Sequence, residues 1–174
     1  GFDEPGEDVA VSCLPNALVL YNPVIDNGPG GFGHPQAKPY FPAISPLHNL
    51  RPGIPPTLFL LGTDDKLIPR DTAQKFETQM RANGDRCELR LYAGQGHGFY
   101  NIHLPNKAYY YRTLAEVDKF LASLGWLEGE PQIPARLLEL DSPTNVDNLA
   151  SSDAAEPNRT NVNSKDVRAS DVVD

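Results

Sequence analysis

The sequence predicts an α/β fold in which a mainly parallel sheet is flanked by helices, and three consecutive segments carry that prediction. Residues 57–61 form an unbroken apolar run, residues 69–84 place apolar side chains at helical spacing, and residues 87–92 form a second strand-like run. A right-handed crossover from strand through helix to strand makes the two strands parallel, and we expect them to be neighbours in one sheet. The carboxyl ends of both strands then lie on the same edge of the sheet.

The first expected element is a short buried strand at residues 17–21, which are mostly apolar. Residues 23–56 are then rich in proline and glycine, so regular structure should be sparse there. A long irregular stretch in a compact domain is usually functional or without fixed structure. Two interpretations carry equal weight: residues 26–50 line part of a substrate cleft, or they wrap over the surface without contacting a ligand.

The next two strands differ in pattern. Residues 57–61 are apolar without alternation, which is typical of a strand covered on both faces, and Gly62 ends the run. Residues 87–92 alternate apolar and polar side chains. That alternation suits the edge of a sheet better than its centre.

Two amphipathic helices are expected to cover the sheet, at residues 69–84 and 106–124, with Gly125 ending the second. The apolar face of the first helix comprises Ala73, Phe76 and Met80. The apolar face of the second comprises Tyr110, Leu114, Val117, Leu121 and Leu124.

Composition divides the chain near residue 128. Residues 1–128 have the pattern of an α/β domain, whereas residues 129–174 are rich in Ser, Asn, Asp and Pro. Such a segment cannot offset the entropy cost of ordering, so we expect a disordered acidic and polar tail. Cys13 and Cys87 set no disulfide framework; they could pair, but isolated buried thiols are favoured.

Charge and hydropathy argue against several partners. The formal net charge is −8, and the clustered Lys and Arg of a phosphate-binding surface are missing, which excludes nucleic acid. No apolar run is long enough to cross a bilayer, and no targeting segment assigns a compartment. The spacings of His34, His48 and His103 are not those of a metal site, so we expect neither metal nor cofactor.

Two loops that follow the predicted strands carry acid–base chemistry. Asp65 follows the strand at 57–61, and His97 lies between two glycines after the strand at 87–92. Open α/β sheets keep their active sites at this edge, so the two side chains should lie within reach of each other. A carboxylate can orient the imidazole, which takes a proton from a hydroxyl and returns it to the leaving group. The spacing into the following helix favours Asp65 over Asp64 as the acid.

The nucleophile that such a pair serves is missing. No Gly-x-Ser-x-Gly occurs in the chain, and Ser45, beside a proline, lacks the strained strand-to-helix elbow that a nucleophile needs. We interpret Ser45 as a turn residue. The sequence therefore predicts the acid and base of a hydrolase without its serine.

Four segments resemble the C-terminal half of an α/β-hydrolase of the esterase and lipase branch, with acetyl esterases and acetylxylan- or feruloyl-esterase-like enzymes among its members. They are residues 17–23, 44–49, 62–69 and 96–99. The resemblance spans residues 10–127 and implies a partial α/β-hydrolase fold whose N-terminal half lies upstream of Gly1. It also implies that Asp65 is the triad acid and His97 the triad base. One departure is Leu61, where many relatives place a histidine.

Three functions follow from this resemblance. The first is a serine esterase that hydrolyses small-molecule or carbohydrate acyl esters through an acyl-enzyme. The second is a serine peptidase of the prolyl-oligopeptidase type, whose catalytic domain ends with similar Asp and His loops. The third is an inactive fragment or interaction module. The chain alone should show no turnover and should need the missing half of the domain as a partner.

Overall fold

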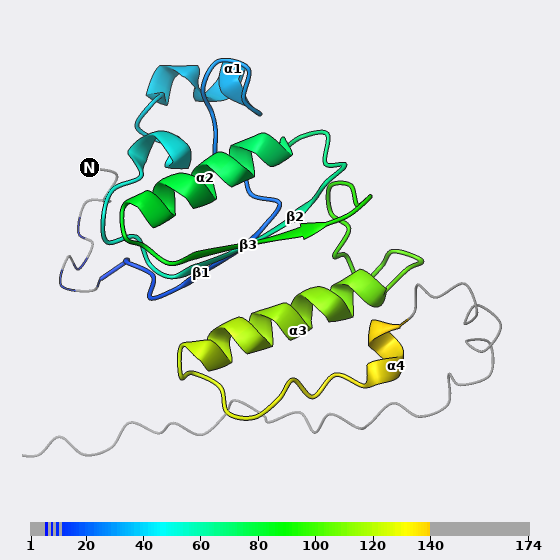
Figure 1. Cartoon of the computed structure of the whole chain (residues 1–174). Helices are drawn as coiled ribbons and strands as arrows, with labels where there is room; N and C mark the ends of the chain where they lie inside the picture. The colour runs from blue at the N-terminus through cyan, green and yellow to red at the C-terminus, as the bar shows by residue number, and fades with distance from the viewer. Residues whose placement is uncertain (1–5, 7, 9, 11, 140–174) are drawn as a thin grey trace, which may run out of the picture. The chain divides into compact units, whose positions relative to one another are not determined.

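The computed structural model describes residues 6, 8, 10 and 12–139 of the chain (Figure 1). Within them, three parallel strands form one sheet in the order β1-β2-β3. The strands are β1 (Leu18–Tyr21), β2 (Thr57–Gly62) and β3 (Cys87–Tyr92). All three were expected from the sequence, and the parallel pairing of the last two is confirmed.

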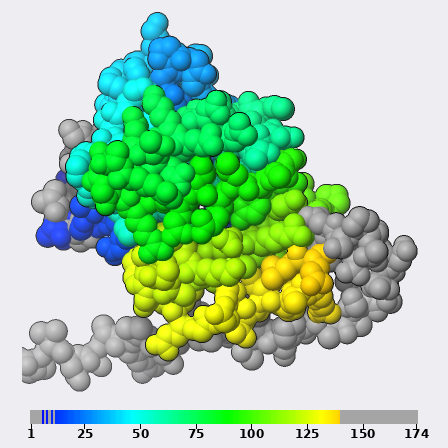
Figure 2. Space-filling model, viewed as in Figure 1, coloured from blue at the N-terminus to red at the C-terminus, as the bar shows by residue number. Residues whose placement is uncertain are grey.

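Two long helices lie on opposite faces of this sheet, α2 (Arg70–Ala82) and α3 (Ala108–Ser123) (Figure 1). Both begin and end within two residues of the predicted bounds. The proline-rich stretch holds only short helical turns, which are α1 (His34–Ala37), η1 (Lys38–Tyr40) and η2 (Pro46–Asn49). In Figure 2, which has the same view, side chains close the gaps between the ribbons of α2, β3 and α3.

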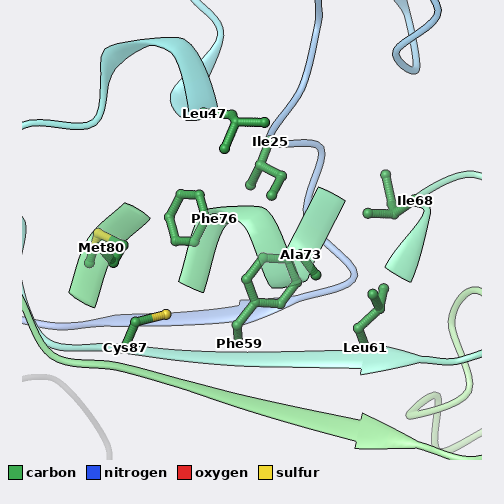
Figure 3. Packing of buried hydrophobic residues seen from close by; sticks show 9 residues of the cluster. All are labelled: Ile25, Leu47, Phe59, Leu61, Ile68, Ala73, Phe76, Met80 and Cys87. Carbon is green, nitrogen blue, oxygen red and sulfur yellow. The ribbon is translucent and has the colours of Figure 1, made fainter. Parts of the chain in front are cut away.

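β2 is buried along its whole length and contributes to two cores, because alternate side chains point to opposite faces of a strand. On the α2 face, the ring of Phe59 packs against the ring of Phe76 with centroids 5.7 Å apart. The predicted apolar face of α2 is confirmed. The buried residues of this core are Ile25, Leu47, Phe59, Leu61, Ile68, Ala73, Phe76, Met80 and Cys87 (Figure 3).

The core on the α3 face is smaller, and the predicted apolar face of α3 is confirmed in part. Leu58 and Leu60 of β2 pack with Phe120, and the predicted Val117, Leu121 and Leu124 are only partly buried there. The buried residues of α3 are Ala108, Thr113, Ala115 and Phe120. Small side chains allow α3 to approach the sheet closely, and the Thr113 hydroxyl donates to the Tyr110 carbonyl, so its burial leaves no unpaired donor.

The segment that was expected to be disordered from residue 129 contains one short helix. Residues 135–138 form the short helix α4 (Ala135–Leu138), and Nε of Arg112 in α3 donates to the Leu138 carbonyl at 2.9 Å. Residues 140–174 lie outside the described residues, so the rest of that expectation and the domain boundary stay predictions. None of the described helices is long and apolar enough to span a membrane.

The two cysteines are free thiols, and only one of them is buried as expected. Cys87 is buried at the start of β3, and burial raises the pKa of its thiol to about 12. Cys13 is exposed, so the expectation of a buried thiol is wrong there. It precedes β1 on a segment without helix or strand, which offers no core to enter.

Candidate active site

Asp65 and His97 meet at the carboxyl ends of β2 and β3. Oδ2 of Asp65 accepts a hydrogen bond from Nδ1 of His97 at 2.9 Å. The Asp65 side chain has no exposed surface, whereas 42% of the His97 side chain is exposed. Because the acid occupies Nδ1, Nε2 is the ring nitrogen that can exchange a proton with a substrate or nucleophile.

The carboxylate of Asp65 is held by hydrogen bonds on both oxygens. Oδ1 accepts from the backbone N–H groups of Leu67 at 2.8 Å and Ile68 at 3.0 Å, and Oδ2 accepts from Nδ2 of Asn22 as well as from His97. Burial acts to raise the pKa of Asp65, but these hydrogen bonds outweigh it and leave the pKa below its ordinary value. The acid is therefore charged and fixed in orientation at neutral pH.

The two loops are joined by backbone contacts as well as by this side-chain pair. The N–H of Asp64 donates to the carbonyl of Gln95 at 2.9 Å, and the N–H of Gly94 donates to Oγ1 of Thr63 at 2.8 Å. A Cβ placed on Gly62 would lie 2.1 Å from the carbonyl oxygen of Gln95. Only glycine fits at this position, and its absence of a side chain lets the two loops touch.

An aromatic side chain anchors the loop that carries His97. Phe99 is buried, and its ring lies 4.8 Å from that of Tyr92 and 5.7 Å from that of Tyr109 at the start of α3. Between His97 and this anchor, Gly98 has a φ of +76°, in the left-handed region that favours glycine. His97 is therefore exposed on a loop that is pinned on its C-terminal side.

The structure separates the two neighbouring aspartates in the way that the sequence spacing predicted. Asp64 is exposed, and its carboxylate accepts from the Thr63 hydroxyl at 3.2 Å. Asp65 is the one that contacts His97. Their catalytic roles remain predictions.

Sequence reasoning missed two residues that support the pair, Asn22 and Phe99. Both lie in segments that carry the resemblance described above, yet neither was given a role. The available signals were a polar residue before proline directly after an apolar strand, and an aromatic residue two positions after His97.

Ser45 does not form a second catalytic constellation, although it lies beside a histidine and an aspartate. Its Oγ shares a hydrogen bond with Nδ1 of His48 at 2.9 Å, and Oδ1 of Asp26 is 3.8 Å from that same nitrogen. A relay needs the acid and the nucleophile on opposite ring nitrogens. Ser45 is also fully buried and accepts from the N–H of Asn27, so the interpretation of Ser45 as a turn residue agrees with its surroundings.

The other histidines bond to their own loops. Nδ1 of His34 lies 2.7 Å from the carbonyl oxygen of Asn27, and the N–H of His103 donates to the side chain of Asn101. Across residues 12–139 and the few described before them, no three metal-ligating side chains come together.

Comparisons with known proteins bear on the family and the fold. The Dienelactone hydrolase family matches residues 34–129, which is more than half of the chain. A thermophilic esterase from the planctomycete Thermogutta terrifontis with propionate bound is 32% identical, with a TM-score of 0.66 over 75% of this chain and 50% of that one. The form phosphorylated by paraoxon is 35% identical, with a TM-score of 0.64 over 74% of this chain and 47% of that one. No curated protein matches the chain.

These matches settle the fold, which is of the α/β-hydrolase type, with a parallel sheet flanked by helices. The chain spans about half the length of the solved esterases that it matches. On the family match over more than half of its residues, the chain belongs to the dienelactone hydrolase family.

Proposed function

We propose that this chain supplies the acid and base of a serine ester hydrolase whose nucleophile lies in a preceding segment of the same domain. The observation that carries the proposal is the hydrogen bond between Asp65 and Nδ1 of His97 at the carboxyl ends of adjacent parallel strands. We call the whole protein, with that segment, the intact hydrolase.

The proposed reaction uses His97 twice. As the serine oxygen attacks the acyl carbon, Nε2 of His97 takes the hydroxyl proton, and Asp65 stabilises the imidazolium that forms. Nε2 then returns that proton to the departing alkoxide, which leaves as the alcohol. In the second half, Nε2 takes a proton from water, which attacks the acyl-enzyme, and returns it to the serine oxygen as the acid departs.

The substrates that we propose are esters of short acyl groups on small molecules or carbohydrates, as for acetyl, acetylxylan or feruloyl esterases. The related Thermogutta terrifontis esterase has been solved with propionate and with butyrate bound, which supports a site for short acyl groups. The acid–base pair itself sets no preference for the alcohol.

A cavity of about 220 Å³ supports the interpretation of residues 26–50 as part of the cleft. It lies between residues 25–32 and residues 67–72. The second wall includes Leu67 and Ile68, whose backbone N–H groups hold Asp65. Neither Asp65 nor His97 lines this cavity itself, but Leu67 and Ile68 belong to the loop that holds Asp65. A larger cavity of about 430 Å³ between β3, α3 and Leu138 has no lining residue from either loop of the pair, so we do not assign the substrate to it.

The test compares ester and peptide hydrolysis by the intact hydrolase. We expect turnover of p-nitrophenyl acetate and none of a prolyl peptide p-nitroanilide; the reverse preference would favour the peptidase alternative. The 174-residue chain alone should hydrolyse neither substrate. Substantial ester hydrolysis by the chain alone would contradict the proposal, because it holds no serine in a nucleophile elbow.

Labelling with paraoxon locates the nucleophile independently. The activated serine attacks phosphorus and p-nitrophenolate leaves, so mass spectrometry of peptides should find a diethylphosphoryl group on a serine that precedes residue 1. A label on Ser45 would overturn both the proposed nucleophile and our interpretation of Ser45.

A further inference from the structure

Asn22 is a buried polar side chain at the carboxyl end of β1. Only 4% of its surface is exposed. Its backbone N–H donates to the Leu60 carbonyl at 2.9 Å, which continues the pairing of β1 with β2. Its φ is +45°, in a region that asparagine tolerates better than most residues other than glycine. The backbone conformation of Asn22 and its burial together fix the position of its side chain.

The side chain of Asn22 contacts the acid of the proposed pair. Its Nδ2 donates to Oδ2 of Asp65, the oxygen that also accepts from Nδ1 of His97. The opposite orientation of the amide would place two oxygens against each other, so the donor must face the carboxylate. Oδ1 of Asn22 is buried without a hydrogen-bond partner among the described residues.

Three neighbouring strand ends thus contribute to one row of hydrogen bonds, with Asn22 after β1, Asp65 after β2 and His97 after β3. Oδ1 of Asp65 is held by its own loop. Without Asn22, Oδ2 would be held only by His97, which is the exposed member of the pair. Asn22 is the contact that holds Oδ2 in place independently of the base.

We infer that Asn22 is a positioning residue, which fixes the rotation of the Asp65 carboxylate so that it can orient His97 throughout the reaction. This inference rests on the proposed function for its effect on turnover. Asn22 acts through Asp65 and not on the substrate, so it should influence kcat and leave KM almost unchanged. If Asn22 served only to end β1, its substitution would lower stability without a selective loss of kcat.

Two substitutions in the intact hydrolase separate these roles. Asn22→Gly removes the donor and tolerates the left-handed backbone without strain. Asn22→Asp keeps the shape but opposes Asp65 with a second carboxyl group. Asn83→Gly is the matched control, because Asn83 caps α2 at the other end of the strands and has no contact with Asp65.

For Asn22→Gly we expect kcat to fall about tenfold or more with KM within about twofold, as befits loss of a hydrogen bond to a charged group. For Asn22→Asp we expect a larger deficit at neutral pH that shrinks, relative to the wild type at each pH, as the pH falls. Two adjacent carboxyl groups then share a proton, and the shared proton replaces the lost donor. His97 is the titratable side chain bonded to Asp65 in the described structure, and comparison with the wild type at each pH removes the pH dependence that both proteins share.

The inference is overturned if Asn22→Gly matches Asn83→Gly in kcat, or if the deficit of Asn22→Asp does not change with pH. A second readout does not need turnover: the proton on Nδ1 of His97 should give a downfield NMR signal that moves or broadens in Asn22→Gly and not in Asn83→Gly. An unchanged signal would also overturn the inference. Absence of ester turnover in the wild type would instead defeat the proposed function, and the NMR comparison would still decide the role of Asn22.

Discussion

The part of the chain that the structure describes holds two contacts between an aspartate and a histidine, and they differ in distance, burial and hydrogen bonding. Oδ2 of Asp65 lies 2.9 Å from Nδ1 of His97, and the acid is wholly buried. Oδ1 of Asp26 lies 3.8 Å from Nδ1 of His48, and about a third of each side chain is exposed. His97 lies in a loop, whereas His48 lies in η2. Asp65 accepts two backbone N–H groups, from Leu67 and Ile68, whereas Asp26 accepts one, from Gly28 at 2.8 Å.

We infer from this difference that the orientation of the imidazole, and not the residue types alone, suits the first contact to the proposed catalytic role. In the first contact the acid occupies Nδ1 and leaves Nε2 for proton transfer. In the second, Ser45 and Asp26 compete for Nδ1, while Ser45 also accepts from the N–H of Asn27 and closes the loop. Substitutions in the first contact should therefore reduce turnover, and substitutions in the second should reduce stability.

The largest expected effect is that of His97→Asn in the intact hydrolase. Removing the base should lower kcat/KM by about 10⁴-fold or more. The melting temperature should change little, because the ring is substantially exposed. His103→Asn is the control, since His103 is an exposed loop histidine whose backbone N–H bonds to the side chain of Asn101. If His97→Asn kept kcat/KM within tenfold of the wild type, the contact between Asp65 and His97 would have no catalytic role, as we expect for the contact between Asp26 and His48.

Asp65→Asn should lower kcat/KM by roughly 10³- to 10⁴-fold. An amide facing Nδ1 can donate instead of accept, which favours the wrong tautomer of His97. Asp64→Asn makes the same change at the adjacent exposed residue, and we expect it to stay within about twofold of the wild type. Steady-state kinetics of both variants decides the assignment, and a severe loss in Asp64→Asn alone would move the role of the acid to Asp64.

Gly62→Ala tests whether contact between the two loops sustains the first pair. The new Cβ would meet the Gln95 carbonyl oxygen at 2.1 Å, so the loop that carries His97 must shift. A displacement of that size should reduce kcat/KM by about 10²-fold. Gly96→Ala is the control, because nothing lies within 4 Å of a Cβ there. Equal kinetics for the two variants would show that the loops tolerate separation.

Ser45→Ala addresses the second contact. The substitution removes the buried hydroxyl of Ser45 and leaves the half-buried N–H of Asn27 without its acceptor, so we expect it to lower the free energy of unfolding by about 1–3 kcal/mol. Urea denaturation measures that loss. The serine that reacts with paraoxon should be labelled at an unchanged stoichiometry. Lost labelling in a folded variant would mean that this cluster takes part in chemistry.

The smallest expected effect concerns acid stability. The pKa of Asp65 is lowered in the folded protein from 3.8, so its ionised form stabilises the fold at pH values above 3.8. That contribution is lost as the pH falls through the lowered pKa. Unfolding free energies measured from neutral to acid pH should therefore fall less steeply in Asp65→Asn than in the wild type, and Asp64→Asn should retain the wild-type slope.

The sequence predicted the elements and the acid–base pair because both depend on local pattern and strand direction. The apolar run of β2 and the helical spacing of Phe76 and Met80 can be recognised without knowing which segments pack against them. The proximity of Asp65 and His97 follows because the carboxyl ends of parallel strands lie on the same edge of a sheet. These are short-range signals that tertiary contacts did not override.

What the sequence did not predict depends on contacts between distant segments. The role of Asn22 requires β1 to lie beside β2, with the side chain turned toward Asp65. The burial of Phe120 depends on how closely α3 approaches the sheet, which its small residues decide. α4 lies in a polar segment whose composition gave no sign of the bond from Arg112.

The most direct test of the central claim is a double-mutant cycle of Asp65→Asn and His97→Asn in the intact hydrolase, measured as kcat/KM for p-nitrophenyl acetate. If the two residues act as one acid–base unit, the double variant should be no slower than His97→Asn alone, because the acid has no role without its base. If the two losses multiply, Asp65 and His97 act independently and the account is contradicted.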